Sequence, residues 1–252
     1  MEGLYNKVHL NFGQKILTIS KALKKFLITG LKCAHLRLKA NGQQNLKQNK
    51  INKKFVYLIS PNKIKDENFY INLALILSSG NVSFFQLRLK KETNSNKLII
   101  GKKIMKICKK YKVKFLINDD PLLAKKLNAD GCHLGQKDMD LIKARKILKN
   151  KIIGITCHNS INLAKRAIAA GADYLAFGAF YVSKTKTVKH KASLTILKSV
   201  KKITSLPIVV IGGIKLNNYK KLLLNKANFL AISGYIWNNK KYKPLEAIKK
   251  LK

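Results

Sequence analysis

From residue 55 onward, short runs of β-branched and aromatic residues alternate with longer stretches in which apolar residues recur every three or four positions. The short runs predict buried strands, and the stretches between them predict amphipathic helices. A last helix is expected over residues 244–252. The expected strands cover residues 55–59, 82–88, 113–118, 131–135, 151–156, 173–178, 207–212 and 228–233.

This alternation also predicts the fold class. Regular strand–helix repeats are typical of parallel strands joined by helical crossovers. Eight such units in about 200 residues predict an α/β protein with a (β/α)8 TIM barrel, near the small end of its size range. An open doubly wound sheet is the alternative, but no G-x-G-x-x-G pattern follows any expected strand.

Residues 1–54 do not follow the alternation. The range 16–32 has helical spacing with a basic face, and the range 40–54 is polar and low in complexity, as linkers are. We therefore expect a basic N-terminal extension and linker over 1–54 and a barrel over 55–252. The basic helix is compatible with packing on the barrel, with poor order and with an anionic membrane surface.

The charge of the chain is strongly positive. Lys and Arg number 52 against 11 Asp and Glu, a formal net charge of +41. Such a balance favours polyanionic partners, but the excess is spread along the chain. It consists mostly of Lys, beside abundant Asn and Ile, which also fits A/T-rich codon usage. A surface without a role, a small anionic substrate and nucleic acid all stay open, with nucleic acid the least favoured.

Cysteine usage and hydropathy indicate the compartment. Cys33, Cys108, Cys132 and Cys157 are far apart and form no C-x-x-C pair, so free thiols in a reducing compartment are expected. No apolar run reaches the roughly 18 residues of a membrane span. The first residues lack an apolar stretch followed by a small-residue cleavage site. We therefore expect a cytoplasmic protein without a membrane span.

Polar residues collect at the carboxyl ends of the expected strands, where barrels of this type carry their chemistry. Along the chain these residues are Gln86, Arg88 and Lys90, then Asn118 and Asp119, Gln136 and Asp138, Thr156, Ser183, Thr185 and Lys186, Gly212 and Gly213, and Ser233 and Gly234.

The charged members of this set predict a diphosphate site with a metal ion. A cation in a barrel wall costs several kcal/mol unless an anion meets it. Arg88, Lys90 and Lys186 suit a diphosphate, Arg as a fork and Lys as point charges. Asp119 and Asp138 among these cations predict Mg²⁺, which binds through one or two carboxylates and substrate phosphates.

The last two strand ends predict a second phosphate site. Gly212–Gly213 and Ser233–Gly234 fall at the seventh and eighth loops, where barrels often bind a phosphate monoester through backbone N–H groups. Two phosphate sites imply two phosphorylated substrates.

Each signal also has an ordinary interpretation. The row from Gln86 to Lys90 is compatible with a solvated strand face, and Asn118–Asp119 with a turn. Asp138 is compatible with a cap of a helix that begins at Met139. His133 and His158 are expected to be structural, because no carboxylate or cysteine stands at ligand spacing from them.

Seven segments resemble one known family. They follow in the order and spacing of the thiamine phosphate synthases, and the resemblance covers roughly residues 55–240. These segments are FFQLRLK, FLINDD, ADGCHLGQKD, IIGITCH, GADYLAFGAFYVSKTK, PIVVIGGI and FLAISGYI.

The resemblance implies a (β/α)8 barrel and a transferase activity. The family condenses 4-amino-2-methyl-5-hydroxymethylpyrimidine diphosphate with 4-methyl-5-hydroxyethylthiazole phosphate, which gives thiamine phosphate and pyrophosphate. The implied partners are these two small molecules, while a homo-oligomer stays open.

Roles for individual residues follow from the same resemblance. It implies that Arg88, Lys90 and Lys186 are catalytic and that Asp119 and Asp138 hold Mg²⁺ on the leaving diphosphate. Thr156 stands where the family usually has Ser, on the pyrimidine side. Contacts with the pyrimidine diphosphate are implied for Gln86, Arg88, Lys90, Asn118 and Lys186, contacts with the thiazole partner for Ser183 and Thr185, and contacts with the thiazole phosphate for Gly213 and Ser233.

Departures from the family pattern and rival functions remain. Leu89 replaces a common acidic residue, and Gly234 stands where Ala is usual. A thiazole tautomerase of the same barrel family is the nearest rival, with His158 as its candidate acid or base, but it has no need of the diphosphate-binding residues. A non-catalytic basic barrel that binds RNA is the other, and it predicts steeply salt-dependent RNA affinity.

Overall fold

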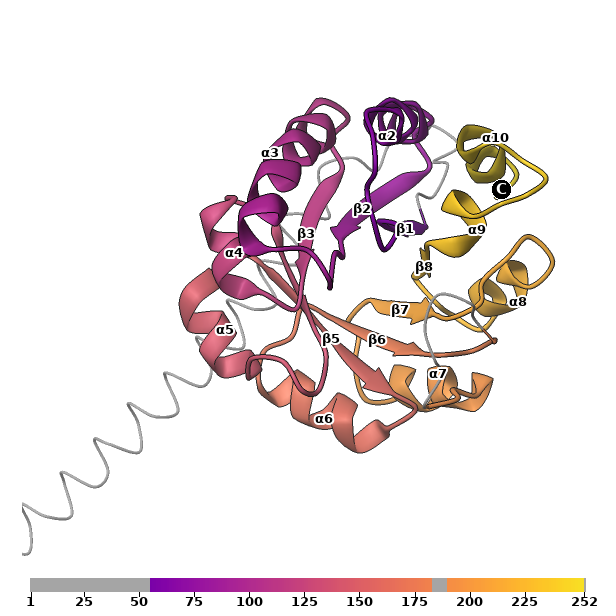
Figure 1. The fold of residues 1–252 in the computed structure, drawn as a ribbon. Helices are drawn as coiled ribbons and strands as arrows, with labels where there is room; N and C mark the ends of the chain where they lie inside the picture. Colours follow the sequence, from indigo (N-terminus) through magenta and orange to yellow (C-terminus); the bar gives the residue numbers. More distant parts are fainter. Residues whose placement is uncertain (1–54, 183–189, 252) are drawn as a thin grey trace, which may run out of the picture. The chain divides into compact units, whose positions relative to one another are not determined.

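The computed structural model describes residues 55–182 and 190–251, all within one compact unit, Asn52–Lys252. Parallel strands close into a barrel in the order β1 to β8, with the helices outside it (Figure 1). The expected TIM barrel is confirmed, and every expected strand ends within two residues of an observed one. The strands are β1 (Val56–Ile59), β2 (Val82–Leu87), β3 (Lys114–Asn118), β4 (Gly131–Leu134), β5 (Ile152–His158), β6 (Tyr174–Gly178), β7 (Ile208–Ile211) and β8 (Phe229–Ile232).

Helices follow the strands around the barrel. The last expected helix is present as α10, and the short α9, which begins directly after Ser233, was not expected. The described helices are α2 (Asn68–Ser78), α3 (Asn94–Lys110), α4 (Pro121–Lys126), α5 (Leu141–Leu148), α6 (Ile161–Ala169), α7 (Leu194–Lys201), α8 (Tyr219–Leu224), α9 (Gly234–Trp237) and α10 (Pro244–Lys249).

Side-chain caps define where several helices begin. Thr93, Asp120, Asp140 and Ser160 each accept a hydrogen bond from a backbone N–H of the first turn of α3, α4, α5 and α6. Such caps satisfy amides that have no partner inside the helix. Because Asp140 caps α5, the interpretation of Asp138 as a helix cap is wrong.

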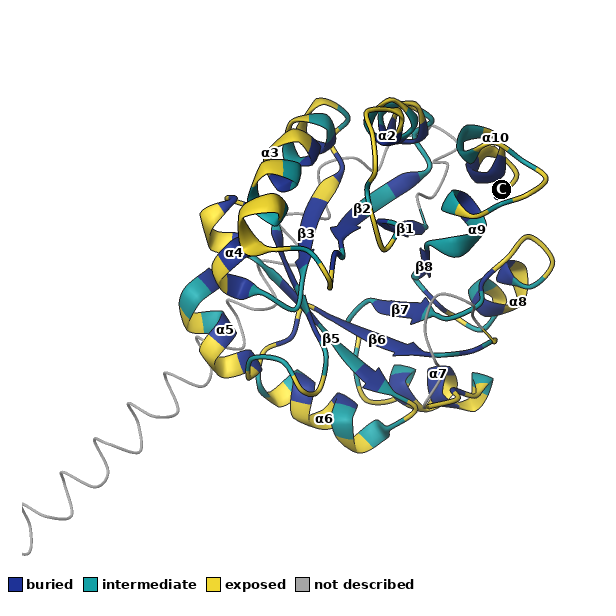
Figure 2. Cartoon of the chain, in the orientation of Figure 1, coloured by how far each residue is buried: buried dark blue, intermediate teal, exposed yellow. Residues whose placement is uncertain are grey.

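Two apolar layers stabilise the barrel. The larger lies between the strands and the helices, so each helix turns a buried stripe inward and an exposed face outward (Figure 2). The smaller fills the barrel interior, where Phe84 meets Phe229 edge to face with ring centroids 5.0 Å apart. The interior is therefore a packed core that supports the mouth from below. Its members are Tyr57, Ile59, Leu116, Tyr174, Ala176, Val209 and Ala231, with Phe84, Ile152, Ile211 and Phe229 packed against them.

A repeated hydrogen bond joins strands at their amino ends. Asp130, Asp173 and Asn228 each precede an even-numbered strand and accept a backbone N–H from the preceding odd-numbered strand, at 2.8–2.9 Å. A basic side chain, Lys114, Arg145 or Lys201, donates to each of these three acceptors. The repeat stabilises the end of the barrel that lies away from the predicted site.

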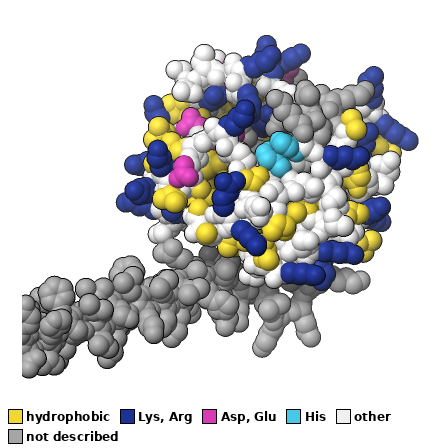
Figure 3. Space-filling view, turned by 90° about the horizontal axis from the view of Figure 1, so that it is seen from below, with side chains coloured by type: hydrophobic (Ala, Val, Ile, Leu, Met, Phe, Trp, Pro, Cys, Tyr) yellow, Lys and Arg dark blue, Asp and Glu magenta, His cyan; other side chains and the backbone are white. Residues whose placement is uncertain are grey.

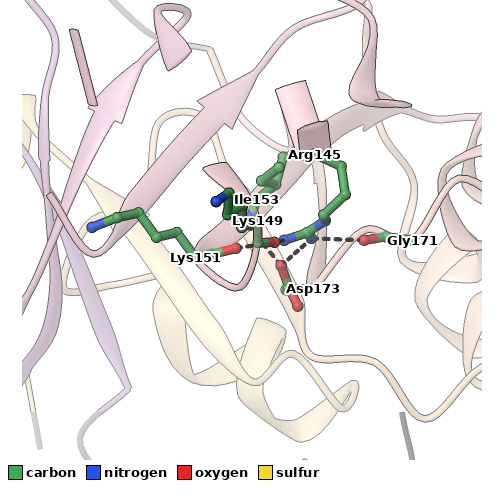
Figure 4. Close-up of polar contacts among 6 residues, drawn as sticks. All are labelled: Arg145, Lys149, Lys151, Ile153, Gly171 and Asp173. Carbon is green, nitrogen blue, oxygen red and sulfur yellow. Dashed lines mark hydrogen bonds and ion pairs between the residues drawn. The ribbon is translucent and has the colours of Figure 1, made fainter. Parts of the chain in front are cut away.

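Arg145 makes the most extensive of these contacts (Figure 4). Its Nη1 donates to the carbonyls of Lys149 and Lys151 at 2.8 and 2.6 Å. Its Nη2 donates to the carbonyl of Gly171 at 2.8 Å and to Asp173 Oδ2 at 2.6 Å. One planar guanidinium thus ties the end of α5 to the starts of β5 and β6.

The surface of the barrel is basic without one continuous basic stripe on the face seen in Figure 3. Lys and Arg side chains stand there among polar and apolar ones, with few acidic groups. Among the described helices, none combines the length and apolar character needed to cross a membrane.

Candidate active site

The carboxyl ends of the strands form the mouth of the barrel. The structure describes nine of the predicted site residues, and the predicted Ser183, Thr185 and Lys186 lie outside the described residues. The nine are Gln86, Arg88, Lys90, Asn118, Asp119, Asp138, Thr156, Gly213 and Ser233.

Lys90, Asp119 and Asp138 form one charged cluster at this mouth. Asp119 follows β3 with a φ of 66°, and its N–H donates to the His133 carbonyl at 2.8 Å. Its Oδ2 pairs with Lys90 Nζ at 2.7 Å. Asp138 Oδ2 accepts from the Gly135 N–H at 2.6 Å, and its carboxyl group interacts with that of Asp119. Loops after β2, β3 and β4 thus bring one cation and two carboxylates together.

The two carboxyl groups have opposite pKa shifts. Burial raises the pKa of Asp138, and the hydrogen bond shared with Asp119 raises it further. Burial also acts to raise the pKa of Asp119, but the hydrogen bonds with Lys90 and Asp138 and the charge of Lys90 lower it below the ordinary value. Two carboxyl groups this close cannot both ionise freely without a cation between them.

The donor set of this cluster fits a hard divalent cation. No group of three or more His, Cys, Asp or Glu among the described residues has metal-ligand geometry. Two carboxylates without further protein ligands are typical of Mg²⁺ sites, in which water and substrate phosphates complete the coordination. Asp119 and Asp138 would hold such an ion.

Asn118 lines the same cavity as Lys90 and Asp119, whereas Arg88 contacts the loop after β1. Arg88 Nη1 donates to Asn62 Oδ1 at 3.1 Å, and its backbone N–H donates to Ser60 Oγ at 2.9 Å. These contacts join the end of β2 to the loop after β1 and hold a half-buried guanidinium at the mouth.

A cavity of about 250 Å³ at the ends of β2 and β3 is lined by Leu87, Leu89, Lys90, Lys97, Ile117, Asn118, Asp119, Asp120 and Leu123.

Gln86 and Thr156 face the barrel interior, below the charged cluster. Gln86 is only 2% exposed, and its Nε2 donates to the Tyr57 hydroxyl at 2.9 Å. Thr156 Oγ1 lies 2.9 Å from His133 Nε2. The Tyr174 hydroxyl joins the two sides, at 2.8 Å from the Tyr57 hydroxyl and 2.8 Å from His133 Nδ1. A continuous hydrogen-bonded chain therefore runs from Gln86 to Thr156 inside the barrel.

Sequence reasoning missed Tyr57 and Tyr174 and gave His133 no part in the site. Their positions in β1 and β6 could have indicated a role, because a polar hydroxyl group is unusual in a barrel core. Gly154 leaves room for the Tyr174 ring in this hydrogen-bonded chain, because a Cβ at residue 154 would overlap that ring. The small residue in β5 lets the tyrosine reach across the interior.

Gly213 and Ser233, for which a second phosphate site is predicted, lie directly after β7 and β8. Gly213 has a φ of 61°, and its carbonyl accepts from Asn218 Nδ2 at 3.0 Å. Ser233 Oγ donates to the Ser60 carbonyl at 3.0 Å. A Cβ on Gly213 would meet the backbone of Tyr181 and Val182, so the loop after β6 packs closely here.

Comparisons with known proteins identify the family. The model of the thiamine monophosphate synthase family matches residues 56–236. A thiamine-phosphate synthase of Pelagibacter ubique (strain HTCC1062) is 87% identical over 207 residues, which cover 82% of this chain and 100% of the relative. One from Marinobacter nauticus (strain ATCC 700491 / DSM 11845 / VT8) is 41% identical over 180 residues, covering 71% of this chain and 81% of the relative.

A solved structure agrees with the sequence matches. A thiamine phosphate pyrophosphorylase from Pyrococcus furiosus superposes with a TM-score of 0.69 and 26% identity, covering 81% of this chain and 96% of that chain. A 3-hexulose-6-phosphate synthase, with a TM-score of 0.57 and 17% identity over 78% of this chain and 98% of that chain, shares the fold alone. This chain therefore belongs to the thiamine monophosphate synthase family.

Proposed function

We propose that the mouth of this barrel condenses 4-amino-2-methyl-5-hydroxymethylpyrimidine diphosphate with 4-methyl-5-hydroxyethylthiazole phosphate, and that each charged group found there has one part in the reaction. The family membership makes the chain a transferase that acts on small phosphorylated substrates. The observation that carries the proposal is the meeting of Lys90, Asp119 and Asp138 at the carboxyl ends of the barrel strands, where β2 also carries the buried Gln86.

The pyrimidine lies on the floor of the mouth in this proposal. Gln86 and Thr156 are the polar side chains at the inward ends of β2 and β5, and both provide neutral hydrogen-bonding groups. A buried amide and a hydroxyl suit an uncharged aminopyrimidine ring better than they suit a phosphate. The ring therefore binds below the charged cluster, with its diphosphate directed toward the rim.

The diphosphate meets the charged cluster. Arg88 binds it as a fork and Lys90 as a point charge, with Asn118 at the adjacent strand end and Lys186 assisting from the loop after β6. Mg²⁺ held by Asp119 and Asp138 would neutralise charge on the leaving diphosphate. The ion pair of Lys90 with Asp119 keeps the ammonium beside this position before substrate binds.

The thiazole partner binds at the opposite rim. Its phosphate contacts the backbone at Gly213 and the hydroxyl of Ser233. The resemblance to the family assigns contacts with the thiazole ring to Ser183 and Thr185, which lie outside the described residues. The bond between the pyrimidine methylene carbon and the diphosphate oxygen breaks first, and the electron pair leaves with diphosphate. The lone pair of the thiazole nitrogen then forms the new carbon–nitrogen bond. Positioning and charge stabilisation suffice for this sequence, which requires no protein nucleophile.

A condensation assay tests this proposal. Purified protein is expected to form thiamine phosphate and pyrophosphate from the two precursors in the presence of Mg²⁺. Removal of the metal with EDTA should abolish turnover, and added Mg²⁺ should restore it. Turnover that continues undiminished in EDTA would contradict the metal assignment, and absence of product with Mg²⁺ present would contradict the function.

A further inference from the structure

The hydrogen-bonded chain inside the barrel has a direction. An amide nitrogen only donates, so the Tyr57 hydroxyl accepts from Gln86 Nε2 and gives its own proton to the Tyr174 hydroxyl. Tyr174 then gives its proton to His133 Nδ1, which accepts in this direction of the chain. The proton on His133 Nε2 is donated to Thr156 Oγ1. Each link thus fixes the orientation of the next one.

Burial maintains this direction. Tyr57 is 2% exposed and Tyr174 3% exposed, and burial raises the pKa of both phenols far above the ordinary value. Both therefore keep one proton each and cannot join the chain as phenolate acceptors. The rings are also held sterically, since Tyr57 lies edge to face with Tyr174, and the Tyr174 ring stacks on His133 with centroids 5.7 Å apart.

The direction determines what the two ends of the chain offer to a ligand. At one end Gln86 uses its nitrogen inside the barrel, which leaves its carbonyl oxygen to accept. At the other end Thr156 Oγ1 accepts from His133, which leaves its own proton to be donated. One acceptor and one donor match an exocyclic amino group and a ring nitrogen of a 4-aminopyrimidine. They do not match a 4-oxopyrimidine, in which the exocyclic group is an acceptor and the ring N–H is a donor.

We propose that Tyr57, Tyr174 and His133 are positioning residues that fix the hydrogen-bond polarity of Gln86 and Thr156 and so select an aminopyrimidine over an oxopyrimidine. The inference rests on the proposed function for its ligand, but the polarity of the chain is a property of the protein alone. A site whose buried polar groups are fixed rejects a ligand of reversed polarity, because donor then meets donor and acceptor meets acceptor.

Tyr174→Phe tests the selection. It keeps the ring and its stacking but removes the central link, so that Tyr57, Gln86 and the His133 tautomer are all free to reorient. We expect the ratio of kcat/KM for the 4-amino over the 4-oxo pyrimidine diphosphate to fall at least tenfold, while KM for the thiazole phosphate stays constant. The intrinsic reactivities of the two pyrimidines cancel when this ratio is compared between proteins.

Tyr235→Phe is the matched control. The Tyr235 hydroxyl is buried and has no hydrogen-bond partner among the described residues, so its removal should leave the ratio unchanged. Thermal unfolding of both variants checks that the fold is retained. A folded Tyr174→Phe protein with the wild-type ratio would overturn the proposal, and so would an equal fall of the ratio in both variants.

An observation on the protein without substrate separates this inference from the proposed function. Nitrogen-15 NMR of labelled histidine reports the tautomer of His133, and we expect the proton on Nε2 in the wild type and a mixture of tautomers in Tyr174→Phe. A proton on Nδ1 in the wild type would reverse the chain and overturn the inference. If the wild type forms no thiamine phosphate, the proposed function fails, and the NMR result alone still decides the polarity.

Discussion

At the scale of single residues, the neighbouring carboxyl groups of Asp119 and Asp138 have pKa values shifted in opposite directions. The charge of Lys90 and its hydrogen bond keep Asp119 ionised, while burial and the neighbouring carboxylate make Asp138 harder to ionise. A divalent cation would remove this conflict, because it lets both groups ionise at once. Metal binding at this pair should therefore lower the pKa of Asp138.

Asp138→Asn tests this coupling. The amide oxygen can still accept from Gly135 N–H, but it supplies no charge to a metal. We expect turnover at saturating substrate and a fixed low Mg²⁺ concentration to fall at least about 100-fold, in line with the effect of a lost charge-stabilising group. The Mg²⁺ concentration for half-maximal rate should rise. Steady-state rates across a Mg²⁺ titration measure both quantities.

Asp140→Asn is the control two residues away. Asp140 caps α5 by accepting from two backbone amides, and Asn caps a helix equally well. Its kinetics should match those of the wild type, and equal losses in both variants would show that Asp138 acts through the loop rather than through charge.

The raised pKa of Asp138 also predicts a pH dependence. Below that pKa the group binds a proton that competes with Mg²⁺, so the apparent Mg²⁺ affinity should increase as pH rises from the ordinary range of an aspartate toward neutrality. In Asp138→Asn, the part of the pH dependence of Mg²⁺ affinity that comes from Asp138 should disappear. The part that comes from the titration of the substrate phosphates should remain. Mg²⁺ titrations of both proteins between pH 5 and pH 8 (roughly one unit above the ordinary Asp value upward) provide the comparison. Identical pH profiles would contradict it.

At the scale of elements, the two ends of the barrel have separate tasks. The amino ends of β3, β5 and β7 are tied to the residues before β4, β6 and β8 by side chains, whereas the carboxyl ends carry the predicted chemistry. Side chains at the amino ends are thus expected to contribute to stability without contributing to turnover.

Arg145→Lys separates these tasks. The lysine keeps the charge but cannot reach three carbonyls and Asp173 from one planar group. We expect the free energy of unfolding to fall by about 1–2 kcal/mol, since the affected carbonyls remain partly open to water. Urea unfolding gives this value, and kcat and KM should stay within twofold of the wild type. A kinetic loss without a stability loss would contradict the division between the two ends.

The sequence anticipated the elements better than their contacts. Alternation of apolar runs located each strand, and the shared side-chain face of Gln86 in β2 and Arg88 just after it followed from the two-residue period of a strand. The same period did not show that Asp140 rather than Asp138 caps α5. Local patterns leave a shift of two residues open, because both aspartates stand just ahead of the same apolar helical run.

At the scale of the whole molecule, the positive charge and the N-terminal residues are the features that the family does not explain. The net charge of +41 belongs to the full chain, and lysines are spread over the face of the barrel drawn in Figure 3. A relative matched over its entire length covers only 82% of this chain.

Truncation tests whether the barrel unit suffices. A chain of residues 52–252 contains all the described strands, both apolar layers and every described site residue. We expect it to fold cooperatively and to retain kcat/KM within about twofold, because residues 52–252 form a compact unit of their own and contain the whole segment that matches the family. Circular dichroism on heating and the condensation assay measure the two properties. An insoluble or inactive truncated protein would show that the N-terminal residues stabilise the barrel.

The sequence by itself determined the fold class, the strand positions and the row of charged residues at the strand ends. These features are local or periodic, and a parallel barrel places every strand end at one mouth whatever the details of its packing. The tertiary structure decided which residues meet inside that mouth. The contact of Tyr57 with Tyr174 joins residues 117 positions apart, and the link from His133 to Thr156 depends on the register of β4 and β5. Such pairings follow from strand register, side-chain length and the room left at Gly154, none of which a single strand's pattern contains.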